Sequence, residues 1–273
     1  MAIITISRQL AGLGDETAQE LAKILNYRFV DKHFLEEKIK SYGVAEAMLD
    51  KYDERKPAFF ASLSQDRDDY LHYLKTAMLC EAGEGSSVFI GRGANSVFRG
   101  VPGVLSVYLV APYEIRLERV KSYFHCDDKR ARQIINQSDN DRIGFHRYFF
   151  DMDWKDPSNY HVVLNTGAFH PVTVAQGIKY FQDSLVTPEV EAQHEKRLRE
   201  LILGHQVVHR IFYEKNVPVH FLEASVSGNT VELFGVVNSH ALAEAAVNSA
   251  KEVAENFDVR SEIQVVHEYS MVP

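Results

Sequence analysis

Short apolar runs alternate with longer amphipathic segments along the first two thirds of the chain. The apolar runs have strand length and cover residues 3–7, 27–30, 88–90, 104–110 and 161–164. Apolar residues recur at helical spacing in residues 16–25, from 34 into the region of 42, 64–82, from 113 through 119, and 172–185. Nearly continuous strands separated by helices are typical of a parallel sheet covered on both faces. We therefore expect a three-layer α/β/α domain.

The last third of the chain has a different pattern. Thr187 and Pro188 supply a helix N-cap and a proline at the first helical position, so we place the domain boundary there, between 1–186 and 187–273. The amphipathic helix that follows either begins the second domain or connects it rigidly to the first. Two strands around Gly228 and Asn229, an alanine-rich helix and a last strand over 259–266 then predict a small α+β unit of order αββαβ.

Composition is that of a globular protein and adds few constraints. The 273 residues are 45% hydrophobic and 25% charged, with a formal net charge of -8, which argues against non-specific nucleic-acid binding. No apolar stretch is long enough to span a bilayer, and residues 1–7 have no signal-peptide character. The two cysteines are too few for a disulfide framework and lie in no C-x-x-C pair. We expect a cytoplasmic protein.

A glycine-bearing turn links the first predicted strand to the first helix. Residues 7–14 read SRQLAGLG, in the place where backbone N–H groups and a helix N-terminus together bind phosphate. The full pattern G-x-x-x-x-G-K-[ST] needs a lysine, but Asp15 follows Gly14. Taken alone, the segment is better interpreted as a tight structural turn.

A series of short motifs changes that interpretation. In order and spacing they resemble the cytidylate kinase-like family: ITISR at 4–8, GDE at 14–16, FVD at 29–31, FIGRGAN at 89–95, DW at 153–154 and DP at 156–157. The resemblance covers roughly residues 1–184. It implies a nucleoside-monophosphate kinase fold with a P-loop, a helical acceptor-binding insertion and a mobile lid, and it implies ATP and Mg²⁺ as cofactors.

The resemblance also assigns roles to individual residues. It places donor phosphates on the loop, with candidate contacts at Ser7, Arg8, Gly12, Gly14 and Thr17. Arg92 resembles the arginine that grips the acceptor phosphate, and a surface arginine in a turn is the alternative. Asp31, at a strand end, either orients the acceptor or caps the next helix.

Several charged residues fall where the lid is expected. Lys129, Arg130 and Arg132 are candidates to neutralise the transferred group, and Asp139 and Arg142 have a D-x-x-R spacing that resembles the acceptor-side contacts of the family. Arg147 is a further candidate for the acceptor side. A solvated, salt-bridged helix face explains the same charges.

The loop leaves its own chemistry open. Arg8 is the only cation in the loop and is a candidate replacement for the missing lysine, although a guanidinium differs in size and shape. Asp15 and Glu16 either recruit magnesium with Thr17, repel the triphosphate, or complement the helix dipole.

Residues 229–237, the alanine-rich helix and residues 259–265 resemble a BON domain, over roughly 197–267. That resemblance implies recognition of a phospholipid or another small ligand. Two other features have a structural and a functional interpretation. His205 and His209 form either a structural pair or metal ligands on one helix face, and the aromatic residues over 145–154 either pack beneath a lid or stack on a base.

Three hypotheses follow from the sequence. The first is an ATP-dependent kinase that phosphorylates CMP or a related nucleotide. The second is an inactive nucleotide-sensing or scaffold protein that couples a kinase-like domain to the BON module, and the missing lysine favours it. The third involves no nucleotide at all.

Overall fold

The computed structural model describes residues 2–51 and 64–266, and the chain divides into two compact units, Met1–His194 and Glu195–Pro273. The division falls inside helix α9 (Pro188–Val208), whereas we predicted a boundary just before that helix. The predicted cap is present, since the Val190 N–H donates to Thr187 Oγ1 at 3.3 Å. Among the described residues, no helix is both long and apolar enough to cross a membrane.

The first unit is built on a parallel sheet, as predicted. Within the described residues the sheet has five strands in the order β2-β3-β1-β4-β5. The strands are β1 (Ile3–Arg8), β2 (Arg28–Val30), β3 (Ser87–Ile90), β4 (Leu105–Val110) and β5 (Val162–Asn165). Every neighbouring pair in this order is parallel. The nearly unbroken apolar character of β1, β3 and β4 therefore reflects burial on both faces of the sheet.

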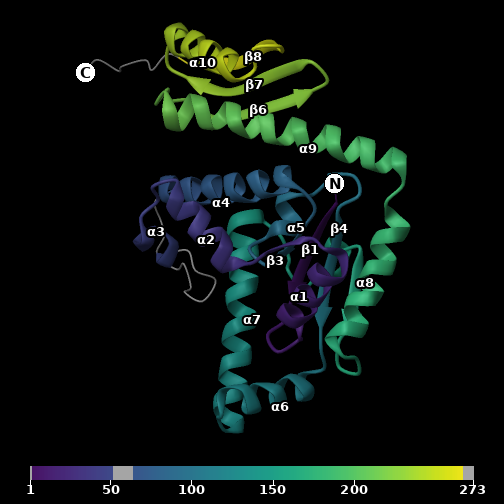
Figure 1. Ribbon diagram of the computed structural model, residues 1–273. Helices are drawn as coiled ribbons and strands as arrows, with labels where there is room; N and C mark the ends of the chain where they lie inside the picture. The colour runs from purple at the N-terminus through teal and green to yellow at the C-terminus, as the bar shows by residue number, and fades with distance from the viewer. Residues whose placement is uncertain (1, 52–63, 267–273) are drawn as a thin grey trace, which may run out of the picture. The chain divides into compact units, whose positions relative to one another are not determined.

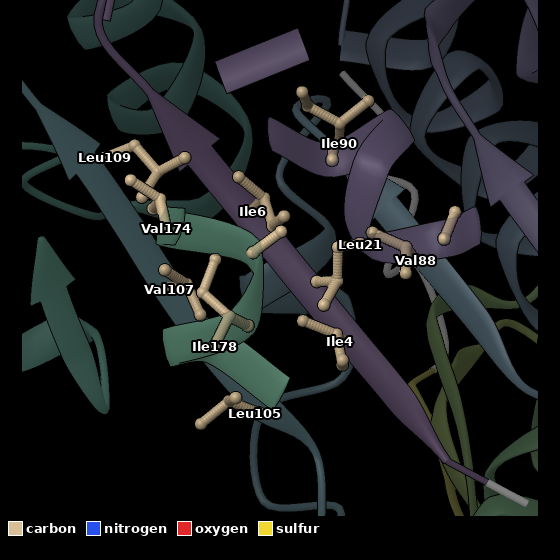
Figure 2. Close-up of a cluster of buried hydrophobic side chains, with 13 residues drawn as sticks. Ile4, Ile6, Leu21, Val88, Ile90, Leu105, Val107, Leu109, Val174 and Ile178 are labelled. Carbon is tan, nitrogen blue, oxygen red and sulfur yellow. The ribbon is translucent and has the colours of Figure 1, made fainter. Parts of the chain in front are cut away.

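One face of the sheet packs against two helices, α1 (Gly14–Leu25) and α8 (Pro171–Leu185). Figure 2 shows Ile4 and Ile6 of β1 between the side chains of β3 and β4, with Leu21 of α1 and Val174 and Ile178 of α8 packed over them. In α1 the buried residues recur at the predicted helical spacing, so one stripe of this helix supplies its half of the core.

Aromatic side chains fill much of the opposite face. Tyr108 stacks on Tyr160 with ring centroids 4.8 Å apart, and Trp154 meets Tyr108 edge-on at 5.2 Å. The Tyr160 hydroxyl donates to the Trp154 carbonyl at 2.9 Å, and burial raises the pKa of Tyr160 to about 12, so this donor keeps its proton at neutral pH. Phe145 and Phe149 are also buried, and the structure therefore favours packing for this aromatic stretch.

Helices that extend from the sheet occupy the two segments in which we expected the insertion and the lid (Figure 1). The insertion contains α2 (Lys32–Ser41), α3 (Glu46–Lys51) and α4 (Ser64–Glu84), and residues 52–63 of it lie outside the described residues. The segment in which we expected the lid lies in the long α7 (Asp128–Phe150), which follows α6 (Tyr113–Phe124). Two short elements, α5 (Ala94–Val97) and the 3₁₀ turn η1 (Pro157–Asn159), complete the first unit as described.

The second unit has the predicted αββαβ order. The end of α9 continues into the π-helical turn η2 (His209–Glu214), followed by β6 (His220–Ser227), β7 (Thr230–Val237), α10 (His240–Val253) and β8 (Asp258–Val265). β6 and β7 are antiparallel and β7 and β8 parallel. The core sets Val231 and Leu233 against Ala246 and Ala250.

Gly235 has a specific role in the second unit. A Cβ at this position would lie 2.6 Å from Val219 Cγ1 and 3.0 Å from the His220 carbonyl oxygen, and its φ is +153°. Only glycine allows β6 to approach β7 so closely beside the irregularity between His220 and Glu223.

Candidate functional site

Three neighbouring strands deliver cationic residues to one edge of the parallel sheet. Arg8 is the last residue of β1, Lys32 follows the end of β2, and Arg92 follows the end of β3. Because β2, β3 and β1 are adjacent and parallel, their carboxyl ends lie side by side. In open α/β sheets this edge is where ligands bind.

The predicted phosphate loop has the backbone of an anion site. Ala11 and Leu13 both adopt left-handed conformations, with φ of +57° and +54°, on either side of Gly12. Alternation of this kind turns successive N–H groups towards one point. Leu13 is also the N-cap of α1 and makes no side-chain capping bond, so the first-turn N–H groups of α1 are left for a ligand.

Donors from other elements hold the carbonyl groups of the same loop. Arg116 Nε of α6 donates to the Leu10 carbonyl at 2.8 Å, and Arg119 Nη1 donates to the Ala11 carbonyl at 3.0 Å. The Thr166 hydroxyl donates to the Gly12 carbonyl at 2.8 Å. The loop conformation is therefore fixed by side chains that lie more than a hundred residues away in sequence.

Arg8 lies across the start of α1. A Cβ on Gly14 would lie 2.3 Å from Arg8 Cγ and 2.5 Å from Arg8 Cβ, so the glycine makes room for this side chain. Arg8 Nη2 pairs with Asp15 Oδ1 at 3.3 Å, and its buried Nε has no hydrogen-bond partner among the described residues. The cation that we proposed in place of the lysine is thus partly neutralised by the residue that follows Gly14.

Without Mg²⁺, we expect Asp15→Asn to strengthen the binding of ATP by roughly two- to fivefold. The change removes an exposed charge pair of modest strength and leaves Arg8 for the phosphates. Calorimetric titration with and without Mg²⁺ measures the effect, with Glu20→Gln as the control, because Glu20 pairs with Lys23 on the same helix. If Asp15→Asn binds ATP more weakly than the wild type only when Mg²⁺ is present, Asp15 is instead assigned to the metal.

A cavity of about 820 Å³ opens beside the loop. Among the described residues, the cationic side chains that line it are Arg8, Lys32, Arg92, Arg130 and Arg142, and the one acidic side chain is Asp141. Gln137 Nε2 donates to Asp141 Oδ1 at 2.5 Å. An excess of positive charge at one hollow of a chain with a formal net charge of -8 selects anionic ligands.

Arg92 is buried at the cavity wall, where the sequence had also allowed a surface turn. Its side chain is 2% exposed, and Arg92 Nη2 donates to Glu36 Oε1 at 2.8 Å. The guanidinium lies over the Phe145 ring, 5.7 Å from the centroid. Gly93 has no room for a side chain, because a Cβ there would lie 2.1 Å from the Phe150 ring. Burial, pairing and ring stacking hold this arginine in one place.

The lid candidates separate into two groups. Arg130 and Arg142 line the cavity, and Arg142 Nη1 also donates to the Ser138 carbonyl at 3.2 Å. The other candidates are not among the lining residues. Arg132 lies over the Tyr113 ring and pairs with Asp128 at 3.8 Å, and Lys129 and Arg147 are exposed.

Asp139 and Arg142 do not face one ligand in this conformation. Both carboxylate oxygens of Asp139 accept from Arg116, at 2.7 and 3.0 Å. Arg116 is itself 3% exposed and binds the loop through its Nε. Asp139 therefore connects α7 to the phosphate loop through Arg116, whereas Arg142 lies at the cavity.

The remaining predicted site residues are not among the residues that line the cavity. Ser7 is 4% exposed and Thr17 is fully buried, with its hydroxyl donating to the Leu13 carbonyl at 2.6 Å. Asp31 Oδ1 accepts from the Phe34 N–H at 2.8 Å and so caps α2, which was the structural alternative for this residue. Gly12 donates through its N–H to the Gln9 carbonyl at 3.1 Å.

Sequence reasoning missed Lys32, Glu36, Arg116 and Asp141. Lys32 could have been found from its position directly after a strand end and Asp31. No local pattern distinguishes the other three. Among the histidines, His209 stacks on Tyr213 and pairs with Glu214 at 3.6 Å, and the described residues contain no group of three metal-ligating side chains. The contacts of His209 with Tyr213 and Glu214 are consistent with the structural interpretation of His205 and His209.

The parallel sheet, the phosphate loop and the cationic cavity define a kinase-like protein of the P-loop class. Residues 3–168, more than half of the chain, match the family model described as the cytidylate kinase-like family. The chain belongs to this family. Membership supports a kinase-like, nucleotide-binding function, and no curated protein matches the chain.

Solved structures resemble about two thirds of the chain. A crystal structure of an uncharacterized protein from Eubacterium ventriosum ATCC 27560 has a TM-score of 0.54 and 20% identity, and the match covers 67% of this chain and 99% of that one. Shikimate kinase from Acinetobacter baumannii, in complex with shikimate, has a TM-score of 0.39 and 17% identity, over 67% and 94% of the two chains. A gluconokinase from Sinorhizobium meliloti 1021 has a TM-score of 0.41 and 15% identity, and the match covers 67% of this chain and 94% of that one. The first of these supports the fold.

Proposed function

We propose that this protein is a nucleoside-monophosphate kinase that transfers a phosphoryl group from ATP to CMP or a related nucleotide. The cavity carries the proposal, because cations from three strand ends and from α7 surround a space large enough for a nucleotide. Phosphoryl transfer depends on positioning and on neutralising charge, and basic side chains from several segments supply both.

Each cation has a place in this proposal. Arg8 and the loop amides, including that of Gly14, would hold the donor phosphates, while the Gly12 N–H stays bonded to the Gln9 carbonyl within the loop. Arg92 and Arg142 would hold the acceptor phosphate, and Arg130 of the lid would neutralise charge that develops during transfer. We give Arg132, Arg147 and Asp139 no contact with nucleotide in this conformation, since none of them is at the cavity wall.

The residues expected for Mg²⁺ fit it only in part. Thr17 does not fit, because its hydroxyl is buried and donates to the Leu13 carbonyl. Asp15 and Glu16 present exposed carboxylates at the start of α1, and Mg²⁺ commonly needs only one or two of these besides nucleotide phosphates. Those two side chains would hold the ion, which would bring the donor phosphates together.

A second candidate function is a nucleotide sensor without turnover. The pairing of Arg8 with Asp15 favours it, because the loop then has no unopposed cation in the place of the lysine. In this proposal the αββαβ unit acts as a BON module that binds a phospholipid or another small ligand, and nucleotide occupancy of the first unit regulates it.

We expect the full chain to bind CMP in calorimetry and to phosphorylate it in a coupled assay with ATP and Mg²⁺, in preference to other nucleoside monophosphates. Binding of CMP and ATP without turnover would reject the kinase and leave the sensor. A preference for a nucleoside monophosphate with another base would change the proposed acceptor and leave the kinase proposal in place. Absence of binding to every nucleotide tested would reject both proposals.

A further inference from the structure

Two cations at the cavity wall converge on one carboxylate oxygen. Arg92 Nη2 lies 2.8 Å from Glu36 Oε1, and Lys32 Nζ lies 3.5 Å from the same atom. Lys32 and Glu36 are one turn apart on α2, whereas Arg92 comes from the loop after β3. Both cations line the cavity, while Glu36 is not one of the lining residues that the structure describes.

This arrangement has the charge and geometry of a phosphate subsite. A guanidinium and an ammonium that meet at one anionic oxygen are a common way to bind a phosphate oxygen, and the guanidinium can engage a second oxygen. Arg92 is 2% exposed, so its charge needs an anion beside it at all times. Glu36, at 22% exposure, supplies that anion when no ligand is bound.

We propose that Glu36 is a built-in competitor for the acceptor phosphate, an inference that rests on the proposed function. An entering phosphate monoester displaces the Glu36 carboxylate and pairs with Arg92 and Lys32 in its place. A phosphate ester carries a charge of about −1.5 to −2 at neutral pH, against one for a carboxylate, so the exchange favours phosphate-bearing acceptors. A monocarboxylate gains nothing by displacing another carboxylate. Glu36 thereby restricts the acceptor to phosphate esters, at a cost in affinity.

The test compares two neighbouring glutamates in the full chain. In Glu36→Gln we expect calorimetry to give about tenfold tighter binding of both CMP and inorganic phosphate, because a competing charge is removed from the two cations. We also expect acetate binding to become measurable. Glu37→Gln is the control. Glu37 is 58% exposed and pairs with Lys40 at 3.3 Å. Glu37→Gln therefore removes the same charge from the same helix without changing a residue at the cavity.

The outcomes separate this inference from the kinase proposal. Tighter phosphate binding by Glu36→Gln, without phosphorylation of any nucleotide, supports the role of Glu36 and rejects the kinase. Unchanged or weaker binding of phosphate by Glu36→Gln overturns the inference and makes Glu36 a residue that only positions Arg92. Absence of phosphate binding by every variant also overturns the inference. Should Glu36→Gln fail to fold, Glu36→Asp replaces it. We expect its shorter side chain to lose one of the two cations, so phosphate binding should strengthen severalfold.

Discussion

Arg92→Ala will weaken the binding of CMP by about 30-fold or more and reduce phosphorylation of CMP at least as much. Losing one partner of a buried, charge-assisted contact typically costs about 2–5 kcal/mol of binding free energy. Arg92 is the most buried cation of the cavity and is held by Glu36 and the Phe145 ring, so its guanidinium is positioned before a ligand binds. Calorimetry with CMP and the coupled assay measure the two effects.

Two variants control this experiment. Arg99→Ala removes a nearby arginine that is exposed and bonded to Asn159, and we expect it to bind CMP as the wild type does. Arg92→Lys keeps the charge but loses the planar fork, so its affinity for CMP should lie between those of the wild type and Arg92→Ala. Circular dichroism establishes that each variant is folded. A folded Arg92→Ala with unchanged affinity for CMP would contradict the assignment of the acceptor phosphate.

Trp154→Ala will destabilise the first unit by about 3–5 kcal/mol, the range for removing a large aromatic side chain from a core. Trp154 is 1% exposed and packs against Tyr108, and its carbonyl accepts from the Tyr160 hydroxyl. For a unit of this size the melting temperature should fall by roughly 6–20 °C. Thermal unfolding followed by circular dichroism is the suitable measurement, because the chain has a single tryptophan and the variant removes it.

The matched control is an aromatic residue on the surface. Tyr180 is 70% exposed, so Tyr180→Ala should leave the melting temperature of the first unit unchanged. A fall of less than about 2 °C in Trp154→Ala would mean that the ring contributes little to the core. The DW motif would then need an explanation through ligand contact.

Much of the fold was predictable, because hydrophobic periodicity reports burial directly. The runs at 3–7, 88–90 and 104–110 became adjacent strands of a parallel sheet, and the change of pattern after Pro188 predicted the αββαβ order. The exact boundary between the two units was harder to predict from the sequence. It depends on which residues of α9 pack on each core, and a continuous helical pattern carries no signal of that change.

The candidate site was predictable only at its strand ends. Arg8 and Arg92 were placed by the sequence, since a residue that follows a buried strand must lie at the carboxyl edge of the sheet. The interpretation of α7 from spacing alone was incomplete. The D-x-x-R spacing places two side chains on a helix, but the partner of Asp139 is Arg116, which is 23 residues away on α6.

The sequence by itself determined that this chain forms a parallel α/β domain with a phosphate loop in which Asp15 follows Gly14 where a lysine is expected. The apolar runs, the helical spacing and the glycine-bearing turn behind this conclusion are local, so neighbouring residues encode them. Only the tertiary structure decided how the charges are paired: Arg8 with Asp15 over Gly14, and Arg92 with Glu36. The physical reason is that the strength of a charge contact depends on distance and burial, and for residues 56 apart in sequence both are set by the packing of the whole domain.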